Sequence, residues 1–364
     1  MNAAREGYST GTCAAAAAKA AVLVLSGRAA PQAADVRLPD GTQARLPVLY
    51  ARRTPDGRES ASAEAAVRKD AGDDPDVTHA TTVVARVDWT AGGEILFAAG
   101  EGVGTVTRPG LSVPPGEPAI NPVPREMIRQ AIRDVTDRAV QVTISIPGGR
   151  KLAEKTFNPR LGIVGGLSIL GTTGRVRPFS HPALQAALKC GVEVAVASGT
   201  TCPVLVPGHI GERAAHTHFE LRPEQVLAVS NEWGFMLDLV AQAPFTHALA
   251  LGHPGKLGKL AAAAWDTHSS RSGSAVAVVA KLGATVLGRE LPEMPTVEGL
   301  FASLPGDERT RLADALATQV RRQIAAFLQA AAGAGPKDAA VVLVNMRGEW
   351  LGTNGDLGPW RRRS

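Results

Sequence analysis

Apolar residues recur at helical spacing in several segments of the chain. The first of these segments, Ala14–Leu25, follows the hydroxyl-rich stretch Ser9–Thr12 and stops at Ser26-Gly27, so a helix start, body and end occur in the right order. Residues 182–198 fit both a helical and an alternating pattern, and we favour the helix. The pattern predicts helices over residues 9–26, 124–138, 182–198 and 309–332.

Short apolar stretches bounded by turn residues dominate the first half of the chain, which indicates strands. They cover residues 36–38, 45–49, 63–68, 81–88, 94–98 and 140–146. Strands therefore dominate the expected first domain, residues 1–180, with helices only at its start and near residues 124–138.

From about Cys202 onward, short apolar strands alternate with helical segments, which is typical of a parallel sheet. The expected strands are residues 203–206, 225–229 and 247–251, and the helices that follow them are residues 212–220, 232–241 and 256–265. We predict an α/β domain with a mostly parallel sheet over residues 181–364, and a last strand, residues 339–345, that could belong to either domain.

Composition narrows the classes of function. A chain of 364 residues, 45% apolar and 20% charged, has material for about two packed domains, which excludes a disordered or fibrous protein. The net charge of +5 is scattered, and aromatic residues make up only 4% of the chain, so stacking platforms for bases are scarce. These features favour an acidic small-molecule ligand over nucleic acid.

The cysteines indicate the compartment. Cys13, Cys190 and Cys202 are odd in number and far apart, without a CxxC pair, so we expect a reduced, cytoplasmic protein without a metal site. The apolar run near the start resembles a secretion signal, but Lys19 inside it argues against export. The run is also too short and too alanine-rich to span a membrane.

Ligands of open parallel sheets bind outside the carboxyl ends of the strands. The loops after three predicted strands combine glycines, which allow close approach of a ligand, with polar groups, and Glu232 could hold a ribose diol. Each loop taken singly also fits an ordinary strand–helix turn. The candidate residues are Gly208, Gly211, Ser230, Asn231, Glu232, Gly252, His253, Gly255 and Lys256.

Common nucleotide-binding motifs fail. The glycines at residues 100–104 lead into a β-like, proline-stopped segment, and the segment around Lys256 and Lys259 is not a P-loop. Two glycine-rich stretches, residues 100–125 and 156–174, are long for loops of a compact domain, which indicates a function or a set of wide turns.

Several short motifs of the chain resemble those of a known protein family. Residues 8–15 (YSTGTCAA), residues 68–78 (RKDAGDDPDVT) and both glycine-rich stretches resemble the cobalt-precorrin-5B C1-methyltransferase family of cobalamin biosynthesis. The likeness continues through Ser230-Asn231, Gly252-His253 and Thr267-His268-Ser269, covers most of residues 7–272, and is weak after about residue 274. It departs from the family pattern at His209-Ile210, which leaves the polar contacts of that loop open.

The resemblance implies a methyl transfer from S-adenosylmethionine to C1 of a corrin-type macrocycle, converting cobalt-precorrin-5B to cobalt-precorrin-6A. It also implies an α+β first domain and a Rossmann-like second domain that holds the cofactor. Transfer from a sulfonium is an in-line displacement, so the protein mainly aligns its ligands and excludes water. Candidates for stabilising charge or moving a ring proton are Asp73, Asp74 and His268.

A corrin precursor carries many carboxylates, for which arginine is the suitable bidentate partner. The candidate substrate-binding residues in the resembling stretches are Thr10, Thr12, Lys69, Asp70, Arg108, Asn121, Arg125, Asn158, Arg160, Thr172, Thr173 and Arg175, with Arg177 beside them. Two alternatives stay open, a non-catalytic tetrapyrrole carrier and a nucleotide-dependent kinase or ligase, although no phosphate-binding motif is clear. A homodimer is left open.

Overall fold

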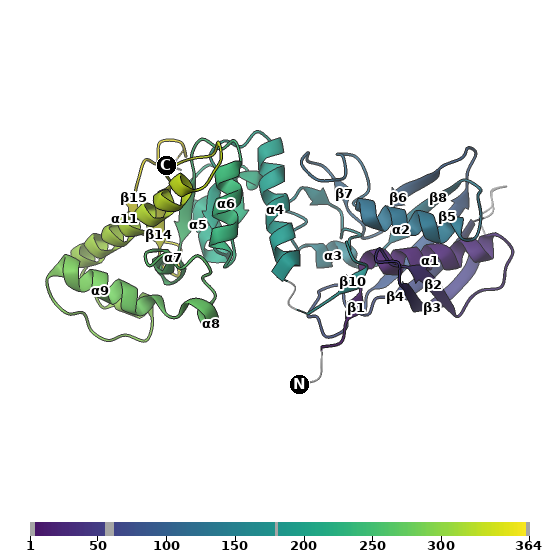
Figure 1. Cartoon of the computed structure of the whole chain (residues 1–364), viewed down its shortest axis with the longest axis horizontal. Coiled ribbons are helices and arrows are strands. Elements are labelled where there is room, and N and C mark those ends of the chain that lie inside the picture. The colour runs from purple at the N-terminus through teal and green to yellow at the C-terminus, as the bar shows by residue number, and fades with distance from the viewer. Residues whose placement is uncertain (1–3, 55–61, 179–180, 362–364) are drawn as a thin grey trace. The chain divides into compact units, whose positions relative to one another are not determined.

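The computed structural model describes residues 4–54, 62–178 and 181–361 (Figure 1). The chain divides into two compact units, Met1–Pro182 and Ala183–Ser364. The domain boundary expected at residue 180 falls on residues 179–180, which lie outside the described part. Each unit contains its own sheet and its own buried core.

The first unit is built on a six-stranded sheet with the order β2-β3-β4-β5-β8-β6. Neighbouring strands are antiparallel except β6 and β8, which are parallel. The strands are β2 (Ala33–Arg37), β3 (Gln43–Thr54), β4 (Ser62–Arg68), β5 (Thr82–Trp89), β6 (Ile95–Ala99) and β8 (Val140–Ser145). The six strands expected in this half are therefore confirmed, with shifted ends.

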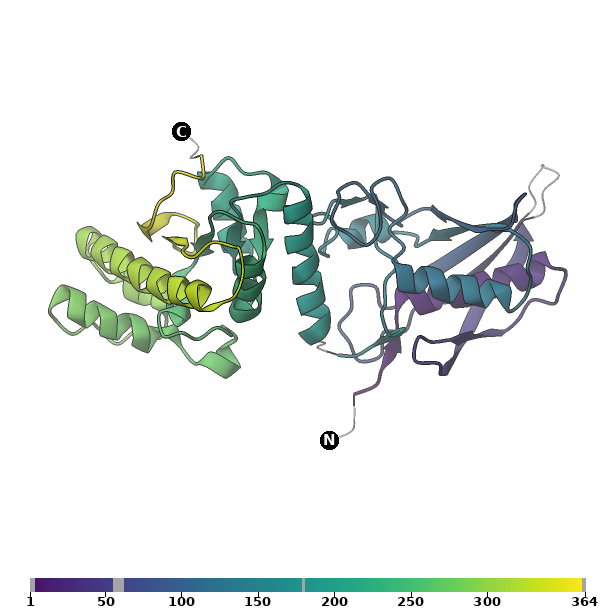
Figure 2. The same ribbon diagram turned by 45° about the horizontal axis from the view of Figure 1, so that its top comes forward.

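Two helices, α1 (Thr10–Leu25) and α2 (Pro122–Arg133), pack against each other, and α1 crosses strands β2 to β5 (Figures 1 and 2). The alanines of α1 are small enough for sheet and helix to enclose it on nearly every side. Its N-cap, Ser9, lies in the expected stretch Ser9–Thr12, and the Ser9 hydroxyl accepts a hydrogen bond from Thr12 N at 3.2 Å.

Helix α2 begins two residues earlier and ends five residues earlier than predicted. It ends at Arg133, and not at residue 138, because Asp134 caps it and the chain must turn before β8 begins at Val140.

The two glycine-rich stretches pair with each other. Strand β7 (Thr105–Val106) lies antiparallel to β9 (Ile163–Val164), and the backbone amide of Asn121 donates to Ile169 O. The short helix α3 (Gly149–Ala153) packs nearby: a Cβ on Gly149 would lie 2.4 Å from Gly102 O. The remaining short strands, β1 (Gly7–Tyr8) and β10 (Arg175–Val176), are antiparallel. The β-like segment predicted after residue 104 is confirmed as β7, whereas α3, β1, β9 and β10 were not expected.

The second unit contains a five-stranded sheet with the order β12-β11-β13-β14-β15. The strands are β11 (Val204–Val206), β12 (Val226–Ala228), β13 (Leu249–Gly252), β14 (Ala340–Val344) and β15 (Trp350–Asn354). Strands β11 to β14 are parallel, and β15, which the pattern did not predict, is antiparallel. The strand predicted at residues 339–345 lies beside β13 in this sheet.

The helices of the second unit are α4 (His181–Ala197), α5 (His209–His218), α6 (Trp233–Gln242), α7 (Pro254–Leu260), α8 (Ser269–Ser272), α9 (Ala275–Leu287), α10 (Val297–Ala302) and α11 (Gly306–Ala330). A short 3-10 turn, η1 (Pro223–Gln225), precedes β12. The helix favoured for residues 182–198 is confirmed as α4. Helix α5 packs on one face of the sheet, while α11 contacts β14 and β15 and runs beside α9 (Figures 1 and 2).

Helix α7 is displaced from its expected range. It begins at Pro254, because His253 caps it and proline suits a first helical position. It ends at Leu260 rather than at residue 265, and the left-handed backbone of Ala263, with φ 55°, breaks the helical path.

Candidate functional site

The carboxyl ends of β11, β12 and β13 meet at one edge of the second sheet. The chain leaves β11 for β12 on one side and returns to β13 on the other, so β11 and β13 flank a topological switch point, where ligands of open α/β sheets bind. Gly208 follows β11 and is exposed, and a Cβ placed there would meet no atom within 4 Å. The backbone at Gly208 is therefore open to solvent.

Two loops touch at this switch point because Gly252 lacks a side chain. A Cβ at Gly252 would lie 2.8 Å from Pro207 Cδ. Gly211 and Gly255 are also tightly placed, since a Cβ would lie 2.7 Å from Leu251 O or 2.9 Å from His253 Nδ1. These three glycines permit packing, whereas Gly208 leaves open space.

The loop after β12 carries two of the candidate polar side chains. Ser230 has a left-handed backbone with φ 57°, which is uncommon for a residue other than glycine. Glu232 is only 7% exposed, and Gln185 of α4 donates from Nε2 to Glu232 Oε2 at 3.0 Å. The carboxylate expected to hold a ribose is thus held in place by an amide.

A polar cluster joins this loop to α7. Lys256 Nζ donates to Asn231 Oδ1 at 2.9 Å, and Thr267 Oγ1 donates to the same oxygen at 3.2 Å. Lys259 Nζ donates to Thr267 O at 3.0 Å. Burial lowers the pKa of Lys256, and the nearby positive charge of Lys259 lowers it further. Thr267 therefore joins the loop after β12 to α7.

The two candidate histidines of this unit have structural partners. His253 accepts a hydrogen bond from Gly255 N at 3.0 Å, and its Nε2 lies 2.8 Å from Glu298 Oε2. His268 is exposed, caps α8, and its Nδ1 lies 2.7 Å from Ser270 Oγ. His268 belongs to the second unit, whereas the other candidate catalytic residues, Asp73 and Asp74, belong to the first.

The acidic segment of the first unit is held by ion pairs. Arg5 forms two hydrogen bonds to Asp70, at 2.5 and 2.9 Å, and these hold the pKa of that carboxyl at about 2. The backbone amide of Arg5 donates to Asp73 Oδ2 at 2.7 Å. Lys69 is buried and lies 2.6 Å from Asp76 Oδ2. The side chains of Lys69 and Asp70, expected to bind substrate, thus have partners within the protein.

Several of the other candidate substrate-binding residues gather where α1 meets the glycine-rich stretches. Thr12 Oγ1 donates to Gly174 O at 2.6 Å, and Thr10 Oγ1 accepts from Leu170 N at 2.9 Å. Asn158 Nδ2 donates to Gly166 O at 3.0 Å. These three side chains are buried and connect backbone segments. Nearby, Thr172 is exposed and Thr173 Oγ1 accepts from Arg175 N at 3.3 Å.

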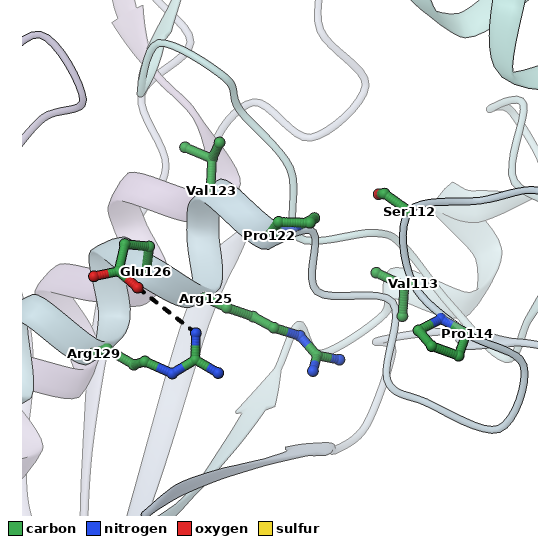
Figure 3. A pocket seen from close by; sticks show the side chains of 8 residues that line it. All are labelled: Ser112, Val113, Pro114, Pro122, Val123, Arg125, Glu126 and Arg129. Carbon is green, nitrogen blue, oxygen red and sulfur yellow. Dashed lines mark ion pairs between the residues drawn. The ribbon is translucent and has the colours of Figure 1, made fainter.

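The candidate arginines form a more open surface. Arg125 donates from Nε to Ile120 O at 2.8 Å and lines a groove of about 490 Å³. Figure 3 shows Arg125 extending toward Val113 and Pro114, while Arg129 pairs with Glu126. The groove is lined by Ser112, Val113, Pro114, Pro122, Val123, Arg125, Glu126 and Arg129. It combines apolar side chains with two arginines that already have acidic partners, Glu117 for Arg125 at 3.1 Å and Glu126 for Arg129 at 3.7 Å.

The remaining arginines contact loops of the same unit. Arg108 Nη1 donates to Arg160 O at 3.1 Å, and the Arg160 guanidinium lies 5.8 Å from the centre of the Phe157 ring. Arg175 Nη2 donates to Thr42 Oγ1 at 3.2 Å, and Arg177 Nε lies 2.6 Å from Glu6 Oε1.

Comparisons with known proteins place the chain in a family. Residues 1–178 match the family model described as CbiD. Over 98% of both chains, the protein is 54% identical to the cobalt-precorrin-5B C(1)-methyltransferase of Syntrophotalea carbinolica. The protein of the same name from Moorella thermoacetica is 40% identical over 96% of this chain and 94% of its own. This chain belongs to the cobalt-precorrin-5B C(1)-methyltransferase family.

One solved structure is also similar to the chain. It is the cobalamin biosynthesis protein CbiD from Archaeoglobus fulgidus, which is 29% identical, with coverage of 74% of this chain and 83% of that chain and a TM-score of 0.39.

In the described ranges 4–54, 62–178 and 181–361, the helices are too short or too polar to cross a membrane.

Family membership confirms the resemblance seen in the sequence, but the predicted site residues did not include every side chain of the polar cluster beside α7. Lys259 and Thr267 were not among the candidate site residues, yet both contact the Asn231 loop or its neighbours. Their signals were present: Lys259 lies one helical turn after Lys256, and Thr267 begins the resembling THS stretch. Gln185, the partner of Glu232, had no comparable signal because α4 is distant in sequence.

Proposed function

We propose that this protein transfers a methyl group from S-adenosylmethionine to C1 of cobalt-precorrin-5B in cobalamin biosynthesis. The observation that carries the proposal is family membership, at 54% identity to a relative of that name over 98% of the chain. We further propose that it acts in the cytoplasm, because Cys13, Cys190 and Cys202 are free thiols, as a reducing compartment favours.

The cofactor is proposed to bind at the switch point of a Rossmann-like second domain. The open space beside Gly208 and the loops at Ser230–Glu232 and Gly252–Lys256 support this placement. Glu232 is suited to accept hydrogen bonds from a ribose diol, since Gln185 orients its carboxylate. S-adenosylmethionine, when bound, supplies an electrophilic methyl group on a sulfonium.

The corrin precursor is proposed to bind the first unit. The groove at Arg125 offers apolar surface for a macrocycle edge, and carboxylates of the precursor can exchange with Glu117 and Glu126 for its guanidinium groups. Thr172, Thr173 and Arg175 offer further donors near the start of α1. Asp73, Asp74 and His268 remain the proposed groups for stabilising developing charge, with alignment of the ligands and exclusion of water as the main contributions of the protein.

The activity is tested by incubating purified protein with the corrin precursor and methyl-labelled S-adenosylmethionine. Mass spectrometry should find one labelled methyl group in the macrocycle. Absence of label, with folded protein, bound cofactor and authenticated precursor, would contradict the proposal and favour a non-catalytic tetrapyrrole carrier.

The placement of the cofactor is tested with Gly208→Ala. The variant should unfold at the same temperature as the wild type, because the new Cβ meets no protein atom, and it should bind S-adenosylhomocysteine more weakly by calorimetry. Gly93→Ala is the matched control, since its Cβ also meets open space, in the first unit. Equal affinity in both variants would place the cofactor elsewhere.

A further inference from the structure

Two lysines at the edge of the second sheet have no acidic partner. Lys256 is partly buried and Lys259 is only 7% exposed, and they lie one turn apart on α7. Within the part of the chain that the structure describes, neither ammonium lies within ion-pair distance of a carboxylate. Their hydrogen-bond acceptors are neutral: Asn231 Oδ1 for Lys256, and Thr267 O and Ser272 Oγ for Lys259.

The carboxylates of the surrounding elements have other partners. Asp266 lies 2.6 Å from Arg271 Nη1, and Glu298 lies 2.8 Å from His253 Nε2. Glu232 accepts from Gln185 Nε2. Among the residues that the structure describes, the two ammonium groups therefore have no carboxylate within ion-pair distance.

Two like charges close together, one buried and one partly buried, repel each other and lose hydration, so a fold retains such a pair at a cost in stability. The cost is recovered when an anion binds between them. Each ammonium has three N–H donors, of which the protein uses one in Lys256 and two in Lys259. Both groups thus keep donors for an external acceptor.

We propose that Lys256 and Lys259 bind a ligand carboxylate, and that this carboxylate is the methionyl carboxylate of S-adenosylmethionine. The assignment rests on the proposed function. The cofactor is favoured over the substrate because Lys256 contacts Asn231, which precedes Glu232, the residue suited to the ribose. A molecule with a carboxylate at one end and a ribose at the other fits this pair of sites along one sheet edge.

The experiment compares Lys256→Met with the wild type and with Lys281→Met, which removes an exposed lysine of α9 in the same unit. Calorimetry is run with S-adenosylhomocysteine, which has the carboxylate, and with 5′-methylthioadenosine, which lacks it. Lys256→Met should weaken S-adenosylhomocysteine roughly ten- to a hundredfold, as expected for a lost hydrogen bond between charged groups. Its affinity for 5′-methylthioadenosine should change less than about twofold, within the additivity of independent contacts.

Further arms separate the possible outcomes. Lys256→Arg should retain part of the affinity, and the ligand-free Lys256→Met protein should melt no lower than the wild type, because an uncompensated charge has been removed. Equal weakening of both nucleosides, with a lower melting temperature, would indicate a structural lysine and overturn the proposal. Weaker binding of a corrin polycarboxylate such as cobyrinic acid, with S-adenosylhomocysteine unaffected, would overturn the cofactor assignment and give the site to the substrate.

Binding of S-adenosylhomocysteine to the wild type distinguishes failure of the proposed function from failure of the lysine assignment. A wild-type protein that binds no S-adenosylhomocysteine would refute the proposed cofactor and, with it, this assignment. Wild-type binding that Lys256→Met leaves unchanged would refute only the role of the lysines.

Discussion

Two buried lysines of this protein differ in their partners. Lys69 is 1% exposed and its ammonium lies 2.6 Å from Asp76, whose other oxygen accepts hydrogen bonds from Thr78 N and Oγ1. Lys259 is similarly buried but has only neutral acceptors. A buried charge with a complete set of partners serves the fold, whereas one without a counter-charge is available to a ligand.

Replacing Asp76 with Asn should therefore destabilise the protein strongly. Removing one partner of a buried pair leaves the ammonium uncompensated and costs about 3–5 kcal/mol of unfolding free energy. Denaturant titration at neutral pH measures it. Asp70→Asn is the matched control and should cost far less, since both side chains of the Arg5–Asp70 pair are about half exposed.

The loss of stability in Asp76→Asn should become smaller as the pH falls. Burial raises the pKa of Asp76, but hydrogen bonds from Lys69 and Thr78 more than offset it, so the pKa lies below its ordinary value. A depressed carboxyl pKa stabilises the fold above the unfolded value of about 3.9, and that contribution disappears as the pH falls further. The difference between wild type and Asp76→Asn should shrink between about pH 5 and pH 2. A constant difference would contradict this.

At the scale of elements, the two glycine-rich stretches form one layer with the start of α1. Gly102, with φ 71°, lies against two other glycines, because a Cβ on Gly149 would be 2.4 Å and one on Gly166 2.1 Å from Gly102 O. Their glycines therefore allow backbone segments to pack against each other. The buried hydroxyls of Thr10 and Thr12 then join this layer to the helix.

Gly166→Ala should consequently lower stability, because the new Cβ would collide with backbone that cannot rotate away. Overpacking of this kind costs about 1–3 kcal/mol or more. Thermal unfolding measures it, with Gly93→Ala as the control in open space. Equal melting temperatures for the two variants would show that the layer is loosely packed.

At the scale of the whole molecule, each unit has its own sheet and core, and the proposed reaction requires two ligands. Positioning two reactants can contribute about 7–11 kcal/mol, whereas one general acid or base typically contributes about 10²- to 10⁴-fold in rate. Binding and alignment should then matter more than any single ionisable side chain.

His268→Ala and Asp73→Asn should therefore leave measurable methyl transfer in the labelled assay. Both side chains are exposed. Gly252→Val should remove the transfer, because even a Cβ would lie 2.8 Å from the Pro207 ring and would push apart the loops at the switch point. Complete loss in His268→Ala, with cofactor affinity intact, would instead assign that imidazole an essential chemical step.

Much of this molecule followed from the sequence by itself. Helix α1 and its Ser9 cap, the strands of the first sheet and the alternation that builds the second depend on neighbouring residues, and the family depends on short motifs. Tertiary structure decided what depends on distant partners. The pairing of β7 with β9 and the hydrogen bond from Gln185 to Glu232 join segments far apart in the chain. The sequence alone does not distinguish the surroundings of Lys69 and Lys256. Only folding brings Asp76 to the Lys69 ammonium and the neutral amide of Asn231 to the Lys256 ammonium.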